Sequence, residues 1–236
     1  FGGMAAFGLM LALLYPIVVK EKKINPSGQA YTKEQQPIKV KNALKTLYSS
    51  HTVIATYIGS GLQLFVAGAI MVWMPSYLNR YYAMPTDKAG VVAAIIVLGG
   101  AIGTVICGML SDRLGRERAD RKTSLAIAFC LGSCLLLSAA FAIPTGTAQI
   151  ALLCLGIFIV IGTNGPSMAM VANLTHHSVH SSAFATLTIA NNLLGIALGP
   201  LVIGKVSDHV GLHDAFQLMP IMSIFTAAVF FYAKRD

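Results

Sequence analysis

Long apolar blocks divide this chain, and they restrict its fold more than any other feature. Each block holds roughly 20 residues or more with no charge near its middle, which is the length a helix needs to cross about 30 Å of hydrocarbon. Of the 236 residues, 56% are hydrophobic and 11% are charged, whereas about a quarter of a soluble domain is charged. A soluble fold of this size could not bury so much apolar surface. The sequence therefore predicts an all-α integral membrane protein whose outer surface has membrane lipid as its partner.

Polar stretches separate seven such blocks. The first covers residues 1–19 and is followed by a long polar linker at 20–49. Residues 50–236 form one predicted transmembrane region, with six helices at about 50–78, 89–110, 123–143, 148–174, 183–206 and 215–233. Because the chain opens inside an apolar block, we expect it to be the C-terminal part of a longer protein.

Lys and Arg side chains concentrate on one side of the predicted membrane region. The linker holds seven, the loop after the 89–110 helix five and the C-terminal tail two, against three in the loops on the other side. Cytoplasmic loops carry such an excess, so the linker and the C-terminus are predicted to be cytoplasmic. We expect a bacterial inner (plasma) membrane. Membrane orientation also accounts for the net charge of +8, and no nucleic-acid partner is expected.

A short motif occurs twice in the chain. Residues Gly108 to Gly115 and residues Gly204 to Gly211 both read G-x-x-S-D-x-x-G, at a separation of 96 positions. Three predicted membrane crossings lie between the two copies, which places them on opposite faces of the membrane. This arrangement predicts an inverted repeat of three plus three helices.

The first copy and the residues after it resemble a family signature. The run Gly108-Met-Leu-Ser-Asp-Arg-Leu-Gly-Arg-Glu-Arg118 is similar to the cytoplasmic signature loop of the major facilitator superfamily, with Glu117 where that family usually has a base. The matched signature positions are Gly108, Asp112, Arg113, Gly115 and Arg116. The resemblance implies a six-helix bundle corresponding to helices 7–12 of a twelve-helix fold, preceded by the end of helix 6 at residues 1–19. Its partner would be the N-terminal six-helix half of the same transporter.

The resemblance implies a function as well as a fold. It implies a secondary active transporter that moves a small organic or amphiphilic solute by alternating access, and not an enzyme. Two segments, from Trp73 to Arg80 and from Asn192 to Pro200, look most like spinster-type transporters of lysolipid or sphingolipid-like amphiphiles. Organic-anion and sugar-acid symporters share part of these motifs and remain an alternative, and a membrane sensor without transport is a third. A membrane-embedded enzyme would need paired acidic or His residues inside helices, which the blocks lack.

In the family, the acidic residue of the signature loop faces the start of the eleventh helix. The resemblance places Asp112 in this role, and the eleventh helix is expected to begin near Ser181. Since a carboxylate is stabilised by the positive end of a helix dipole, the contact could act as a gate latch. Alternatively, Asp112 and the adjacent Arg residues only anchor the loop at the membrane surface.

Polar residues at helical spacing mark the candidate substrate cavity. They are Thr56, Ser60, Gln63, Asn164, Ser167, Thr188, Asn191 and Asn192. Because polar groups in hydrocarbon are costly without partners, we expect these residues to face the cavity between the two halves; the alternative is hydrogen bonding between helices inside the bundle. No charged residue lies near the middle of a block, so any proton- or sodium-coupling residue is expected outside this half. No cofactor and no metal site are predicted.

Overall fold

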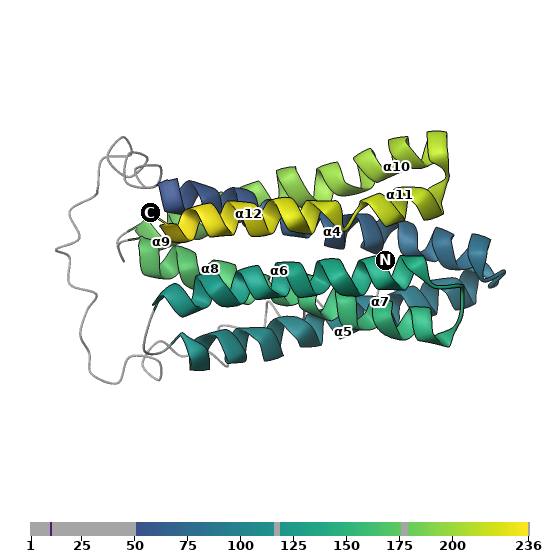
Figure 1. The fold of residues 1–236 in the computed structure, drawn as a ribbon, viewed down its shortest axis with the longest axis horizontal. Helices are drawn as coiled ribbons and strands as arrows, with labels where there is room; N and C mark the ends of the chain where they lie inside the picture. Colours follow the sequence, from purple (N-terminus) through teal and green to yellow (C-terminus); the bar gives the residue numbers. More distant parts are fainter. Residues whose placement is uncertain (1–9, 11–50, 116–118, 176–178, 236) are drawn as a thin grey trace. The chain divides into compact units, whose positions relative to one another are not determined.

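The computed structural model describes Met10 and residues 51–115, 119–175 and 179–235 (Figure 1). The predicted end of helix 6 at 1–19, Met10 excepted, and the linker at 20–49 therefore lie outside the described residues. Apart from Met10, the described residues belong to one compact unit, Val40–Asp236. Every regular element described in this unit is helical.

Six spans in this unit are long and apolar enough to cross a membrane, which confirms the predicted all-α membrane fold. The first three spans are α4 (His51–Tyr81), α5 (Thr86–Leu114) and α6 (Ala119–Ala142). The fourth consists of α7 (Thr147–Gly162) and α8 (Asn164–Leu174). The fifth joins α9 (His180–Ala190), the π-helical segment η2 (Asn191–Ala197) and α10 (Leu198–Val210). The sixth consists of α11 (Leu212–Leu218) and α12 (Ile221–Arg235).

Helix ends extend beyond the apolar blocks. The second span, for example, was expected at 89–110 but runs from Thr86 to Leu114. Its first turn contains Asp87, whose carboxylate is favoured by the positive end of the helix dipole. Hydropathy marks the stretch that lies in hydrocarbon, whereas helical hydrogen bonding continues into the polar turns on either side.

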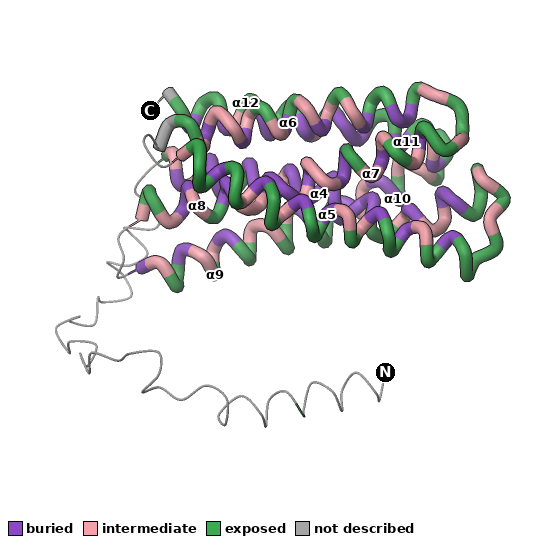
Figure 2. The backbone as a smooth tube through the Cα atoms, turned by 90° about the horizontal axis from the view of Figure 1, so that it is seen from below, coloured by how far each residue is buried: buried purple, intermediate pink, exposed green. Residues whose placement is uncertain are grey.

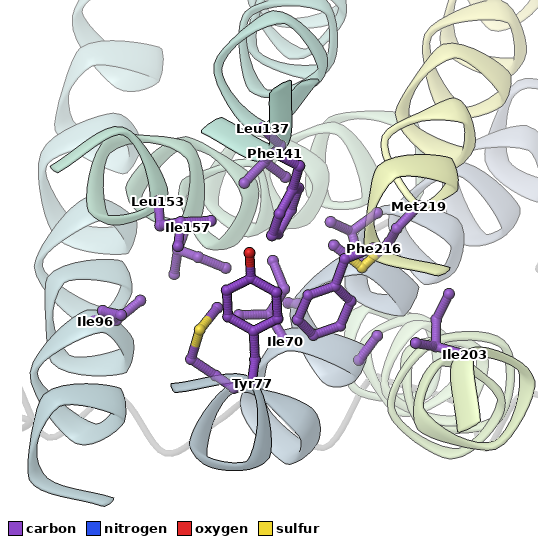
Figure 3. Packing of buried hydrophobic residues seen from close by; sticks show 14 of the residues in the cluster. Ile70, Tyr77, Ile96, Leu137, Phe141, Leu153, Ile157, Ile203, Phe216 and Met219 are labelled. Carbon is purple, nitrogen blue, oxygen red and sulfur yellow. The ribbon is translucent and has the colours of Figure 1, made fainter. Parts of the chain in front are cut away.

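The first span, α4, lies at the centre of the unit. In its membrane window 78% of the residues are buried, against 22% in the span from His180 to Val210. Figure 2 shows this contrast along the backbone. Around Tyr77, the largest buried cluster brings together side chains of α4, α6 and α11, among them Phe141 and Phe216 (Figure 3). The described half therefore has a packed core of its own.

Glycines let α4 approach the fifth span closely. A Cβ atom added to Gly195 would lie 2.7 Å from the Leu64 Cβ and 2.8 Å from the Gly61 carbonyl oxygen, and one added to Gly68 would lie 3.0 Å from the Ile196 Cα. Small residues at such positions bring helix backbones into contact in membranes. The η2 segment is consequently held against α4.

Two of the spans are irregular near their middle, and a proline explains each. Pro166 has no N–H to donate to the carbonyl of residue 162, and α7 gives way to α8 at Thr163. Pro200 likewise leaves the carbonyl of residue 196 without its helical donor, and the π-helical segment η2 comes just before it. Short π-helical segments are frequent at functional sites.

The repeated motif ends a helix in both copies. The Gly115 N–H donates to the Ser111 carbonyl over 2.8 Å, and the Gly211 N–H donates to the Ser207 carbonyl over 2.9 Å. The first copy closes α5 and the second closes α10, at opposite ends of the unit (Figure 1). This placement agrees with the inverted repeat expected from the motif.

A Gly211→Ala substitution should destabilise the turn between α10 and α11. Gly211 has φ +88° and ψ 159°, a backbone conformation that is restricted to glycine, and an alanine there would cost about 1–3 kcal/mol. Gly90→Ala is the control, because a Cβ at Gly90 meets no atom within 4 Å. Thermal unfolding in detergent should show a lower midpoint for the first variant only; equal midpoints would contradict the assignment of strain to Gly211.

Candidate functional site

A narrow polar pocket lies between α4 and the broken fourth span. Its walls are formed by Ser60, Gln63, Leu64, Val160, Thr163, Asn164 and Ser167. The space inside is about 140 Å³, including the part that is open to the outside, and it is too narrow for a water-sized sphere. Ser60 stands nine residues into α4 and Asn164 seventeen residues into the fourth span, so the pocket lies well inside the apolar region.

The orientation of the Gln63 amide is set by α6. Its Nε2 donates to the Ser133 hydroxyl over 3.0 Å, and that hydroxyl donates to the Cys130 carbonyl over 2.9 Å. Because the single Ser133 hydrogen is already used, Ser133 can only accept from Gln63. The Gln63 Oε1 atom is therefore the free end of the amide.

Two buried oxygen atoms of this pocket have no hydrogen-bond partner among the described residues. They are the Ser60 Oγ and the Gln63 Oε1, on side chains that are each only 2% exposed. A buried polar atom without a partner costs about 1–3 kcal/mol. Such a cost at two atoms facing one pocket marks the pocket as a candidate binding site.

The predicted cavity residues divide into two groups. Thr56, Ser60, Gln63 and Ser167 are buried inside the unit, and Asn164 is half-buried at the same pocket. Thr56 donates its hydroxyl to the Thr52 carbonyl over 2.8 Å. The stripe on α4 thus points into the bundle, where Gln63 makes the kind of helix-to-helix hydrogen bond that was the alternative interpretation.

The second group lies on the fifth span. Thr188 and Asn192 are exposed, and Asn192 Nδ2 donates to the Thr188 carbonyl over 2.8 Å. Asn191 is half-buried, and its Oδ1 is buried without a partner among the described residues. These three residues border the start of η2. None of the three lines the pocket beside α4, so the two groups are separate.

The signature loop forms an ion pair with the next helix. An Asp112 carboxylate oxygen lies 3.7 Å from the Lys122 Nζ, and the Asp112 side chain is 74% exposed. A Cβ at Gly115 would collide with the stem of Lys122, so glycine there leaves room for the lysine. The Gly108 Cα lies against Gly165 of α8, and Arg113 is exposed. Arg116 is outside the described residues. The eleventh helix of the family scheme begins at His180, one residue before the expected Ser181, with no side-chain cap.

A second polar cluster was not predicted from the sequence. It lies at the end of the unit where α4 meets α5, and its centre is the fully buried Gln149 of α7. The Gln149 Nε2 donates to the Tyr77 hydroxyl over 3.1 Å and to the Ala140 carbonyl over 2.9 Å, and its Oε1 accepts from Tyr82 over 2.6 Å. The Tyr77 hydroxyl also lies 3.1 Å from the His213 Nδ1. The cluster ties four spans together.

In that cluster, burial raises the pKa of the Tyr82 hydroxyl above its usual value of 10.0, and the hydrogen bond to the Gly146 carbonyl opposes the shift only in part. The phenol therefore stays protonated and able to donate at physiological pH. The sequence offered one signal for this cluster, a polar Gln149 at the start of an apolar block. Its partners come from loops and helix ends that no spacing rule connects.

Comparison with known proteins decides the family. A sequence profile described as the Major Facilitator Superfamily matches residues 1–200. The chain belongs to the major facilitator superfamily. This superfamily consists of transporters, so the chain belongs to a family of membrane transporters and not to a family of enzymes.

Several members of the superfamily share sequence with this chain. A probable sphingolipid transporter, spinster homolog 3 of Arabidopsis thaliana, is 24% identical over 192 residues, which cover 81% of this chain and 37% of the relative. Spinster homolog 1 of Xenopus laevis is 28% identical over 227 residues, which cover 86% of this chain and 41% of the relative. A probable galactarate/D-glucarate transporter of Escherichia coli is 27% identical over 151 residues, which cover 54% of this chain and 34% of the relative. The chain thus spans about two fifths of the length of the spinster relatives.

A solved structure has the same fold. The crystal structure of a bacterial homolog of the human lysosomal transporter spinster, inward-facing and unoccupied, matches with a TM-score of 0.71 at 16% identity. The match covers 98% of this chain and 57% of that structure. Transporters of this superfamily have two six-helix halves, and the six described spans agree with one such half.

Proposed function

We propose that this chain is the C-terminal half of a secondary transporter that moves an amphiphilic solute by alternating access. It would work joined to an N-terminal six-helix half, and we call the joined protein the two-half transporter. The spinster relatives, two of which are named as probable sphingolipid transporters, support an amphiphile as the substrate class. Alternating access follows from the general design of transporters with two repeated halves.

The observation that carries this proposal is the surface of the fifth span. Thr188 and Asn192 are exposed there among exposed apolar side chains, including Ile189, Leu193 and Ile196. Neutral hydroxyl and amide groups on an aliphatic surface suit a solute with a polar head and an apolar tail. In the two-half transporter this surface would line the substrate path.

A sugar acid or organic anion is the second candidate, because the galactarate/D-glucarate transporter is among the relatives. Such a substrate would need a Lys or Arg in the middle of the path. In the described spans these residues occur only within about six residues of an end, as with Arg80 and Lys205. The described half therefore favours the amphiphile.

Transport by purified two-half transporter in proteoliposomes tests this proposal. We expect movement of a fluorescent zwitterionic lysolipid and no saturable uptake of radiolabelled glucarate. A Thr188→Val and Asn192→Leu double variant should slow lysolipid transport about tenfold, which corresponds to about 1.4 kcal/mol of lost interaction.

Thr186→Val is the matched control, because Thr186 lies on α9 two residues from Thr188 and so on a different face of the helix. Its hydroxyl donates to the Ser182 carbonyl over 2.9 Å, as the Thr188 hydroxyl donates to Phe184. Glucarate uptake without lysolipid transport would replace the amphiphile with the sugar acid. Equal slowing of lysolipid transport by Thr186→Val and by the double variant would show that Thr188 and Asn192 do not line the substrate path.

We propose the same membrane orientation that the sequence predicts. Arg113 lies in the last turn of α5, and Arg121 and Lys122 lie at the start of α6. Lys234 lies near the end of α12 at the same end of the unit. The excess of positive charge at this end supports a cytoplasmic location for it.

An Asp112→Asn substitution should separate the latch from the surface anchor. If Asp112 latches a closed state through a helix N-terminus, its neutralisation should change the transport rate about 5- to 30-fold, equivalent to about 1–2 kcal/mol. The exposed pair with Lys122 contributes little by itself, so Lys122→Gln should leave the rate near that of the unmodified protein. An unchanged rate in Asp112→Asn would end the latch interpretation.

A further inference from the structure

We propose that the pocket between α4 and the broken fourth span binds a sodium ion. This proposal stands on the pocket's own geometry and does not depend on which solute is transported. Coupling residues were expected outside this half because no charged residue lies near the middle of an apolar block. A site made of neutral oxygens needs no charged residue.

Two hydroxyl hydrogens at the pocket, those of Thr163 and Ser167, are already used elsewhere. The Thr163 Oγ1 donates to the Ile159 carbonyl over 3.0 Å, and the Ser167 Oγ donates to the Thr163 carbonyl over 3.0 Å. Each hydroxyl is left with lone pairs for any occupant of the pocket. Both residues line the pocket and are almost completely buried.

The Gln63 amide adds a third acceptor. Its Nε2 donates to Ser133, so the Oε1, which has no partner among the residues that the structure describes, is the atom left for the pocket. The Ser60 Oγ, equally buried and without a described partner, stands one helical turn away on the same face of α4. The half-buried Asn164 has an amide oxygen to offer at the same pocket.

An acceptor-rich pocket selects the charge of its ligand. Lone pairs repel an anion or a carbonyl group and attract a cation. The Asn164 amide also carries an NH₂ group and the Ser60 hydroxyl a hydrogen, both of which can turn away from a cation. Hard cations prefer the oxygen atoms that remain. The described residues that line the pocket include no carboxylate, so this neutral set could not balance a divalent ion removed from water. A monovalent cation is the remaining class.

The size of the pocket selects among monovalent cations. The space does not admit a water-sized sphere. A bare sodium ion is smaller than a water molecule, a potassium ion is about as large as one, and a substituted ammonium group is larger. Transporters commonly hold sodium with helix-break and hydroxyl oxygens near the membrane midplane. Here the Thr163 carbonyl already accepts from the Ser167 N–H over 3.2 Å and from the Ser167 hydroxyl over 3.0 Å, so side-chain oxygens would hold the ion.

Thermal unfolding of the detergent-solubilised two-half transporter tests the site. Sodium chloride should raise the unfolding midpoint along a saturable curve, and potassium, choline and ammonium chloride at equal ionic strength should not. Ser60→Ala should raise the apparent Kd for sodium about tenfold. Gln63→Glu, which keeps the size and adds a negative charge, should lower that Kd at neutral pH.

Ser223→Ala is the matched control. Ser223 is also fully buried, and its Oγ has no hydrogen-bond partner in the described part of the chain, but it lies on α12 outside the pocket. Its sodium response should equal that of the unmodified protein. Equal midpoints in sodium and choline, a response to ammonium and not to sodium, or an unchanged Kd in Ser60→Ala would each overturn the proposal. If the variants do not fold, the sodium-23 NMR line is measured with the unmodified protein. The protein should broaden the line, and lithium but not choline should reverse the broadening. A line that is not broadened would overturn the proposal.

Discussion

Gly103→Ala should separate α5 from α7 and destabilise the protein strongly. A Cβ at Gly103 would collide with the carbonyl oxygen of Phe158, and it would also lie 2.8 Å from the Phe158 carbonyl carbon. Backbone cannot rotate away as a side chain can, so the two helices must move apart. Overpacking of this kind costs about 1–3 kcal/mol, and the backbone contact places Gly103 at the upper end.

Gly99→Ala is a control four residues earlier in α5. A Cβ at Gly99 meets no atom within 4 Å, and alanine favours a helix over glycine by up to about 1 kcal/mol. Thermal unfolding in detergent should therefore give a lower midpoint for Gly103→Ala and an unchanged or higher midpoint for Gly99→Ala. Equal midpoints would show that α5 and α7 do not pack through Gly103.

Gln149→Met should be the most damaging change in the polar cluster around Tyr77. Methionine keeps the length of the side chain but removes its bonds to Tyr77, Ala140 and Tyr82. Since the Ala140 carbonyl then lacks this donor and Tyr82 loses its shortest partner, we expect a loss of about 2–3 kcal/mol in the free energy of unfolding.

Gln217→Met tests whether burial is the reason for the large effect expected of Gln149→Met. Gln217 lies on α11 beside the same cluster and donates to the Phe141 carbonyl over 3.1 Å, but its side chain is exposed. Water can replace the Gln217 amide as a hydrogen-bond donor. Gln217→Met should therefore lower the free energy of unfolding by well under half as much as Gln149→Met. Denaturation curves of both variants measure the difference, and a Gln217 variant as unstable as the Gln149 variant would contradict a buried network.

The six spans could be predicted from the sequence because hydrocarbon thickness sets the length of an apolar block. The signature loop around Asp112 was recognised for a similar reason, since its residues are contiguous. Helix rotation could not be predicted in this way. The stripe of Thr56, Ser60 and Gln63 has the correct helical spacing for a face, yet spacing does not say which neighbour that face meets.

Glycines show the same limit. Gly99 and Gly103 are equivalent by spacing, but only Gly103 faces a neighbouring backbone. The Gln149 cluster joins residues as far apart as Tyr77 and His213, and its geometry depends on helix ends and loops. Side-chain hydrogen bonds across the bundle follow from packing that a single sequence does not encode in any local pattern.

Accessibility of Asn192→Cys to a membrane-impermeant thiol reagent tests alternating access most directly. In the two-half transporter the new thiol should react from each side of the membrane in turn, in right-side-out and in inside-out vesicles, and a transported lysolipid should slow both reactions. Ser223→Cys, at a fully buried position, should not react from either side. An Asn192→Cys thiol that reacts from neither side, or from one side only and without protection by the lysolipid, would contradict the proposed transport path.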